Sequence, residues 1–214
     1  ESLIRDIAEC DAMILRTAKM DEEVLEDGKK LRIVARHGAG YDNLDVKAAK
    51  ERGIITTYSP DTTALSVAEM TITLLLMLAK KVKRMETELR KDNFSYKFSH
   101  KGMDVSGKTL GIIGLGKIGK MVAKKAAIGL DMKVISYIPR PEGKEIPEYI
   151  KAVPLEQLLK ESDFISLHVP GGAKNQNLIG EKELEQMKES AFLLNLSRGG
   201  VVNESEFAEA VRKK

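Results

Sequence analysis

The segment Gly114-Leu115-Gly116-Lys117-Ile118-Gly119 decides the fold, because it has G-x-G-x-x-G spacing between a predicted strand and a predicted helix. The apolar run at 109–113 precedes it and a helical pattern over 117–128 follows. In this context Gly114 permits a tight turn, Gly116 lets the backbone approach a pyrophosphate, and Gly119 lets the helix pack closely on the strand. The start of such a helix binds phosphate. We therefore predict a dinucleotide-binding unit here, in preference to a glycine-rich turn without a ligand.

Apolar, β-rich runs alternate with helical patterns on both sides of this unit. Strict alternation predicts βαβ units, and thus an α/β protein with a Rossmann-type, doubly wound parallel sheet. A capping box of Asn203 and Glu206 is expected to start the last helix. The expected strands are 12–15, 31–35, 54–56, 109–113, 133–137, 150–153, 163–168 and 191–196.

One long helix is predicted from Ser66 to about Arg90. Its first half, 70–79, is apolar nearly all round, whereas its second half, 80–91, is charged. Such a helix lies either in the core or at an interdomain or subunit contact, and both interpretations stay open. The uncharged run is too short to span a membrane.

Composition excludes several classes of protein. The 214 residues are 43% hydrophobic and 31% charged, which is too apolar for a disordered chain. The net charge of +3 is too small to indicate a nucleic-acid-binding protein. One cysteine, Cys10, and three widely separated histidines give no disulfide framework and no metal-ligand spacing, so no metal is expected. The chain begins with Glu1 and ends in a charged run, which we interpret as a fragment of a cytoplasmic protein whose missing start could have carried a targeting segment.

The end of the strand at 133–137 bears on the choice of cofactor. An acidic residue is expected there to bind the adenosine ribose of NAD, but Ile138, Pro139 and Arg140 follow instead. Arg140 is placed to meet the 2′-phosphate of NADP. The alternative is that Arg140 is a solvated loop cation and that other contacts hold NAD.

Five stretches together resemble the D-2-hydroxyacid dehydrogenases, and particularly their phosphoglycerate dehydrogenase branch. The resemblance covers essentially the whole chain, in order and at the family's spacing. It is specific for the family and says little about the substrate. The stretches are residues 36–45 (RHGAGYDNLD), 66–69 (SVAE), 107–119 (GKTLGIIGLGKIG), 162–170 (SDFISLHVP) and 195–204 (NLSRGGVVNE).

The resemblance implies two α/β domains with the active site in the cleft between them. By it, residues 1–62 are part of a flavodoxin-like substrate domain, and residues 63–214 are the nucleotide-binding domain. The resemblance and the apolar first half of the helix that begins at Ser66 together predict a homodimer formed through that helix. The resemblance also implies a catalytic Glu and His that lie outside this chain.

The resemblance also assigns site residues. Arg198 takes the substrate's carboxylate and carbonyl, which agrees with the fork of donors on a guanidinium, and the backbone amides of Ala39 and Gly40 are a second clamp. A surface arginine and a plain turn are the alternatives. His37 is read as a loop residue, and a structural role for His168 is an open alternative. The implied cofactor contacts are Gly114, Gly116, Lys117, Ile118, Gly119, Ile138, Arg140, His168, Val169, Pro170, Asn175 (where the family commonly has Thr), Leu196 and Ser197.

The expected activity is hydride transfer between NAD or NADP and a small 2-hydroxy or 2-keto acid, with 3-phosphoglycerate as one candidate. An alternative from another class is a nucleotide-sensing binding protein, as in the corepressor branch that resembles this family. No nucleic acid or membrane partner is expected.

Overall fold

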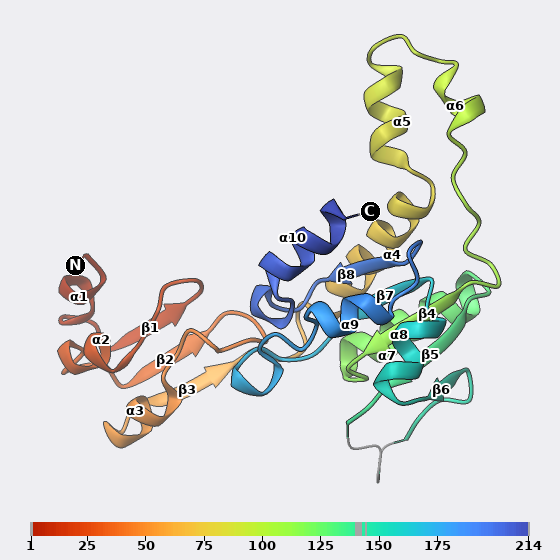
Figure 1. Cartoon of the computed structure of the whole chain (residues 1–214). Coiled ribbons are helices and arrows are strands. Elements are labelled where there is room, and N and C mark those ends of the chain that lie inside the picture. The colour runs from red at the N-terminus through yellow and green to blue at the C-terminus, as the bar shows by residue number, and fades with distance from the viewer. Residues whose placement is uncertain (1, 140–142, 144, 214) are drawn as a thin grey trace. The chain divides into compact units, whose positions relative to one another are not determined.

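A computed structural model describes residues 2–139, 143 and 145–213, so Arg140 lies outside the described residues. The chain forms two compact units, residues 1–64 and residues 65–214 (Figure 1). Each unit has a parallel sheet with its own order of strands. The predicted α/β class and the Rossmann-type parallel sheet are confirmed.

The first unit is a three-stranded parallel sheet, ordered β1-β2-β3, with short helices between its strands. Its apolar core includes Leu15 and Val34 on one face of the sheet, packed against helix residues such as Leu25. The opposite face carries exposed side chains, Ile14 (79%) and Ile55 (61%). The elements are α1 (Ser2–Ile7), β1 (Ala12–Leu15), α2 (Glu22–Asp27), β2 (Ile33–Arg36), α3 (Val46–Glu51) and β3 (Ile55–Tyr58).

The second unit is a five-stranded parallel sheet with the order β6-β5-β4-β7-β8. The chain runs outward from β4 to β6 and then returns to β7 beside β4, so the strand order reverses between β4 and β7. Ligands of such sheets bind at the carboxyl ends of the strands at this switch point. The strands are β4 (Thr109–Ile113), β5 (Lys133–Tyr137), β6 (Ile150–Ala152), β7 (Phe164–Leu167) and β8 (Phe192–Asn195).

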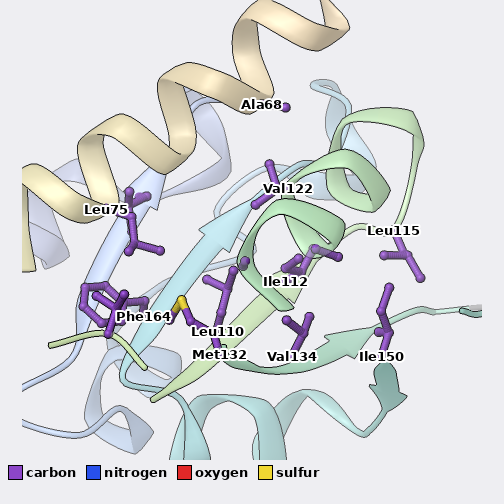
Figure 2. Packing of buried hydrophobic residues seen from close by; sticks show 14 of the residues in the cluster. Ala68, Leu75, Leu110, Ile112, Leu115, Val122, Met132, Val134, Ile150 and Phe164 are labelled. Carbon is purple, nitrogen blue, oxygen red and sulfur yellow. The ribbon is translucent and has the colours of Figure 1, made fainter. Parts of the chain in front are cut away.

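Helices cover both faces of this sheet. On one face Leu110 and Ile112 of β4 pack with Leu75 and Val122 from two helices (Figure 2). On the other face Ile113 packs with Leu158 and its neighbours. The helices are α4 (Ala64–Ala79), α5 (Val82–Leu89), α6 (Tyr96–Ser99), α7 (Lys117–Gly129), α8 (Leu155–Glu161), α9 (Glu181–Gln186) and α10 (Glu204–Arg212), with the short 3-10 turns η1 (Ala173–Asn175) and η2 (Gly199–Val201).

The single long helix predicted from Ser66 to Arg90 is wrong, because two helices, α4 and α5, occupy this stretch. Lys81 between them has a left-handed φ of 54°. The carbonyl of Ala79 accepts a hydrogen bond from the backbone of Met103 at 2.9 Å. A segment far along the chain therefore donates a hydrogen bond to a carbonyl near the end of α4, where the helix breaks.

Only one of the two hydrogen bonds of the predicted capping box forms at the last helix. The side chain of Asn203 accepts from the backbone N–H of Glu206 at 3.3 Å. The carboxylate of Glu206 accepts instead from the backbone N–H of Glu181 at 2.6 Å, at the start of α9. The second half of the box is thus replaced by a bond between two helices.

Candidate functional site

The three glycines of the loop after β4 differ in what a side chain would meet at each position. Gly114 has a φ of 98°, and a Cβ there would lie 2.6 Å from the carbonyl oxygen of His168. A Cβ on Gly119 would lie 2.3 Å from the carbonyl oxygen of Gly114. Around Gly116, which precedes α7 with a φ of −83°, a Cβ would meet nothing within 4 Å. The fold itself requires the first and third glycines, whereas the space beside Gly116 is open for a ligand.

Lys117 and Ile118 form the first turn of α7. The first amides of a helix have no intrahelical acceptor, and the helix dipole favours an anion there. This turn follows β4 at the switch point, which is where a pyrophosphate would sit. The geometry therefore suits the predicted role of these two amides.

The segment after β7 lies against the glycine loop. The backbone N–H of His168 donates to the carbonyl of Ile113 at 2.8 Å, and Val169 is close to Gly114. The side-chain amide of Asn175 donates to the carbonyl of Pro170 at 2.8 Å. Asn175 therefore ties this loop to itself, and its predicted contact with a cofactor stays a prediction.

Ile138 directly follows β5 and is buried. Its position at the carboxyl end of the strand next to β4 fits the predicted adenosine side of the site. The prediction for Arg140 falls outside the described residues.

Arg198 lies in a turn that directly follows β8, and the side chain of Asn195 braces this turn. The amide of Asn195 donates to the carbonyl of Arg198 at 2.8 Å. Its carbonyl oxygen accepts from the backbone N–H of Ser197 at 3.0 Å and from the hydroxyl of Ser197 at 2.7 Å. The backbone that carries Leu196, Ser197 and Arg198 is therefore held in one conformation at the carboxyl end of the strand.

The loop with Ala39 and Gly40 belongs to the first unit and follows β2. The guanidinium of Arg36 donates to the side chain of Asn43 at 3.2 Å and also to the carbonyl of His37. Asn43 in turn donates to the carbonyl of Ala18 at 2.6 Å. These bonds hold both ends of the loop, and the predicted role of Ala39 and Gly40 stays a prediction.

The described residues of the second unit thus bring most of the predicted cofactor contacts to one edge of one sheet. The loops after β4, β5, β7 and β8 all leave the sheet at its carboxyl edge. The predicted substrate clamp, Ala39 and Gly40, belongs to the other unit. His37 is exposed in the same loop as Ala39.

Sequence reasoning did not single out Ser166, Asn195 and the pair of Arg36 and Asn43. Ser166 is a polar residue within the apolar strand β7, and such a residue needs a hydrogen-bond partner. Asn195 stands two residues before Ser197, which is the spacing of an Asx turn. Both signals were present, but the partners of Arg36 and Asn43 come from tertiary structure.

Burial lowers the pKa of His168 from 6.5 to about 4, because a buried site disfavours the charged imidazolium. The ring is therefore neutral at physiological pH. Its Nε2 atom lies 2.9 Å from the hydroxyl oxygen of Ser166.

This lowered pKa predicts a pH-dependent stability. Between pH 6.5 and pH 4 the unfolded chain binds a proton at His168 that the folded chain does not, so the free energy of unfolding falls as the pH decreases. We expect a loss of about 2 kcal/mol from this group between pH 7.5 and pH 5. Urea unfolding of the wild type and of His168→Gln checks this. An equal dependence on pH in both proteins contradicts the assignment to His168.

Among the described residues, no group of three or more His, Cys, Asp or Glu side chains could hold a metal ion. In the same part of the chain, no helix has the length and apolar character needed to cross a membrane.

Comparison with known proteins identifies the second unit. Residues 72–214 match the sequence model of the D-isomer specific 2-hydroxyacid dehydrogenase, NAD binding domain. Over 99% of its length the chain is 39% identical to hydroxypyruvate reductase of Thermotoga maritima, of which it covers 68%. It is also 37% identical to D-3-phosphoglycerate dehydrogenase of Methanocaldococcus jannaschii, of which it covers 41%.

A solved structure agrees with these relatives. Across 98% of this chain, the fold matches D-lactate dehydrogenase from Aquifex aeolicus, complexed with NAD and lactic acid, with a TM-score of 0.88 and 31% identity. The chain covers 63% of that protein. The fold and the sequence therefore point to the same group of proteins.

Proposed function

Because the chain belongs to the D-isomer specific 2-hydroxyacid dehydrogenase family and contains its NAD-binding domain, we propose that the protein interconverts a small 2-hydroxy acid and its 2-keto acid. The observation that carries this proposal is the switch-point edge of the second unit. There the glycine loop, the 168–170 segment and the Arg198 turn follow β4, β7 and β8, which are neighbouring strands. A dinucleotide bound by the glycine loop and the 168–170 segment would have its reactive end near the Arg198 turn.

Each part of the chain has a proposed task. The glycine loop and the amides of Lys117 and Ile118 hold the pyrophosphate, and Leu196 and Ser197 line the place of the nicotinamide. Bound there, the nicotinamide supplies or accepts the hydride. Arg198 binds the carboxylate and polarises the carbonyl of the substrate, because its guanidinium keeps its charge at any working pH. The amides of Ala39 and Gly40 are the second group of donors for the carboxylate.

Substrate and cofactor preference are narrower proposals. Relatives of this chain are named for hydroxypyruvate and for 3-phosphoglycerate, so both are candidates. The missing carboxylate after β5 and the presence of Arg140 favour NADP over NAD. Binding of NAD at least tenfold tighter than NADP contradicts this preference.

The test is calorimetric titration of the full-length protein with NADH and NADPH, followed by reduction assays. The assay panel comprises glyoxylate, hydroxypyruvate, 3-phosphohydroxypyruvate and pyruvate. Binding together with turnover of at least one keto acid supports the proposal. Tight binding without any turnover favours the nucleotide-sensing alternative.

We also propose that the protein is a homodimer formed through α4 and α5. One side of α4 is buried through Ala64, Ala68, Thr71, Leu75 and Ala79. The rest of the helix exposes further apolar side chains, and α5 has no buried residue. We call this exposed set, Met70, Leu74, Met77, Leu78, Val82 and Leu89, the α4–α5 surface. Exposed apolar residues gathered on two consecutive helices favour an interaction site.

Sedimentation of the full-length protein checks the dimer. We expect Met70→Glu to produce monomers, because a charge would be buried without a partner in the interface. Val211→Glu is the control, since Val211 is equally exposed but lies on α10. A monomeric wild type contradicts the proposal.

A further inference from the structure

The hydroxyl of Ser166 is fully buried and lies 2.9 Å from Nε2 of His168. Within the described part of the chain, this ring nitrogen is the one hydrogen-bond partner of the hydroxyl. A buried hydroxyl without an acceptor for its proton is destabilising. The hydroxyl of Ser166 therefore donates its proton, and Nε2 of His168 accepts it.

This direction fixes the tautomer of His168. A neutral imidazole carries one proton, so when Nε2 is an acceptor the proton is on Nδ1. Every buried side-chain nitrogen and oxygen atom in the described residues has a hydrogen-bond partner, yet Nδ1 of His168 has none. Nδ1 must therefore reach the molecular surface, where it offers an N–H donor.

The place of this donor is at the switch point. His168 follows β7, and its carbonyl oxygen would contact any side chain at Gly114 in the neighbouring loop. The backbone of His168 therefore lies beside the glycine loop of the proposed dinucleotide site.

We propose that Ser166 is a positioning residue that holds His168 as the Nδ1–H tautomer, so that the ring presents an uncharged donor to an oxygen atom of the bound dinucleotide. The inference rests on the proposed cofactor role of the loops after β4 and β7. Without the hydroxyl, the ring would exchange between two neutral tautomers, and the Nε2–H form has no proton at Nδ1.

The neighbouring strand supplies a matched control. Ser136 of β5 is also fully buried, and both serines pair in register with Ile112 of β4. The hydroxyl of Ser136, however, donates to the carbonyl of Ile112 at 2.9 Å. Ser136→Ala and Ser166→Ala therefore remove the same group at matching depths in the sheet, but only Ser166→Ala acts on His168.

Two measurements on the full-length protein test the inference. With histidine labelled by nitrogen-15, long-range NMR spectra report the tautomer, and His168→Gln assigns its signal among the three histidines. We expect the Nδ1–H form in the wild type and in Ser136→Ala, and a mixture in Ser166→Ala. Calorimetry with NADH should show affinity about three- to tenfold weaker for Ser166→Ala and unchanged for Ser136→Ala.

Three results would overturn the inference, in two different ways. An Nε2–H tautomer in the wild type, or equal NADH affinity in the two serine variants, removes the role of Ser166 while the cofactor site stands. Normal NADH binding by Gly116→Ala instead shows that the cofactor site itself is misplaced, and the inference falls with it.

Discussion

Replacing Arg198 with Ala is expected to lower kcat for any accepted keto acid by a factor on the order of 10²–10³. The guanidinium is the proposed donor both to the substrate's carboxylate and to the carbonyl oxygen, where negative charge grows as hydride arrives. Arg198→Lys should be almost as damaging, because an ammonium offers a point charge without the planar fork of donors. NADH affinity should stay near that of the wild type, because the glycine loop and the start of α7 remain intact.

Arg212→Ala is the control for charge, since Arg212 is also exposed and lies in α10. It removes one positive charge from the same unit without changing the turn after β8. Steady-state kinetics and calorimetry on the three variants separate the effects. Turnover by Arg198→Ala at the wild-type rate would remove Arg198 from the mechanism.

Substitutions in the glycine loop are expected to give the second large effect. Gly119→Ala and Gly116→Ala should both weaken NADH binding, but for different reasons. Gly119→Ala places a methyl group 2.3 Å from the carbonyl oxygen of Gly114, so the helix must move away from the strand. Overpacking of this kind costs about 1–3 kcal/mol of stability, and the displaced loop should bind NADH weakly or not at all.

Gly116→Ala should lower the free energy of unfolding by no more than about 1 kcal/mol, which is the cost of Ala at the N-cap of α7, because the added methyl group meets no protein atom within 4 Å. It should nevertheless weaken NADH binding by at least about tenfold, since the methyl occupies the space that the pyrophosphate needs. Thermal unfolding and calorimetry measure the two quantities. A Gly116→Ala variant that binds NADH normally would contradict the proposed place of the cofactor.

Much of the fold could be predicted from the sequence because its signals are local. Each strand of the second unit is a short apolar run bounded by a turn, and each helix has its own periodicity, so alternation alone predicts a parallel sheet. The break after Ala79 was not predictable in this way. At this break the backbone N–H of Met103, more than twenty residues further on, donates to the carbonyl of Ala79.

The residues of the candidate site also separate into those with a local signal in the sequence and those whose partners are seen only in the structure. Residues whose roles follow from backbone geometry, such as Gly114 and Gly119, could be found by spacing alone. Residues that act through another side chain, such as Ser166 and Asn195, required the structure, because a serine in a strand does not reveal which group it will face. Arg198 lies between these cases, since the resemblance supplied its role and the bonds from Asn195 explain how its turn is held.

The separate apolar clusters of the two units have a calorimetric consequence. One cluster, with Leu15, Leu25 and Val34, lies wholly within residues 1–64, and the other two lie within residues 65–214. A small sheet with one exposed apolar face buries little surface for its length and is marginally stable by itself. We therefore expect heat to unfold the chain in two transitions, with the smaller unit first. A single melting temperature would then not describe this protein, and any substitution must be assigned to the transition of the unit that carries it.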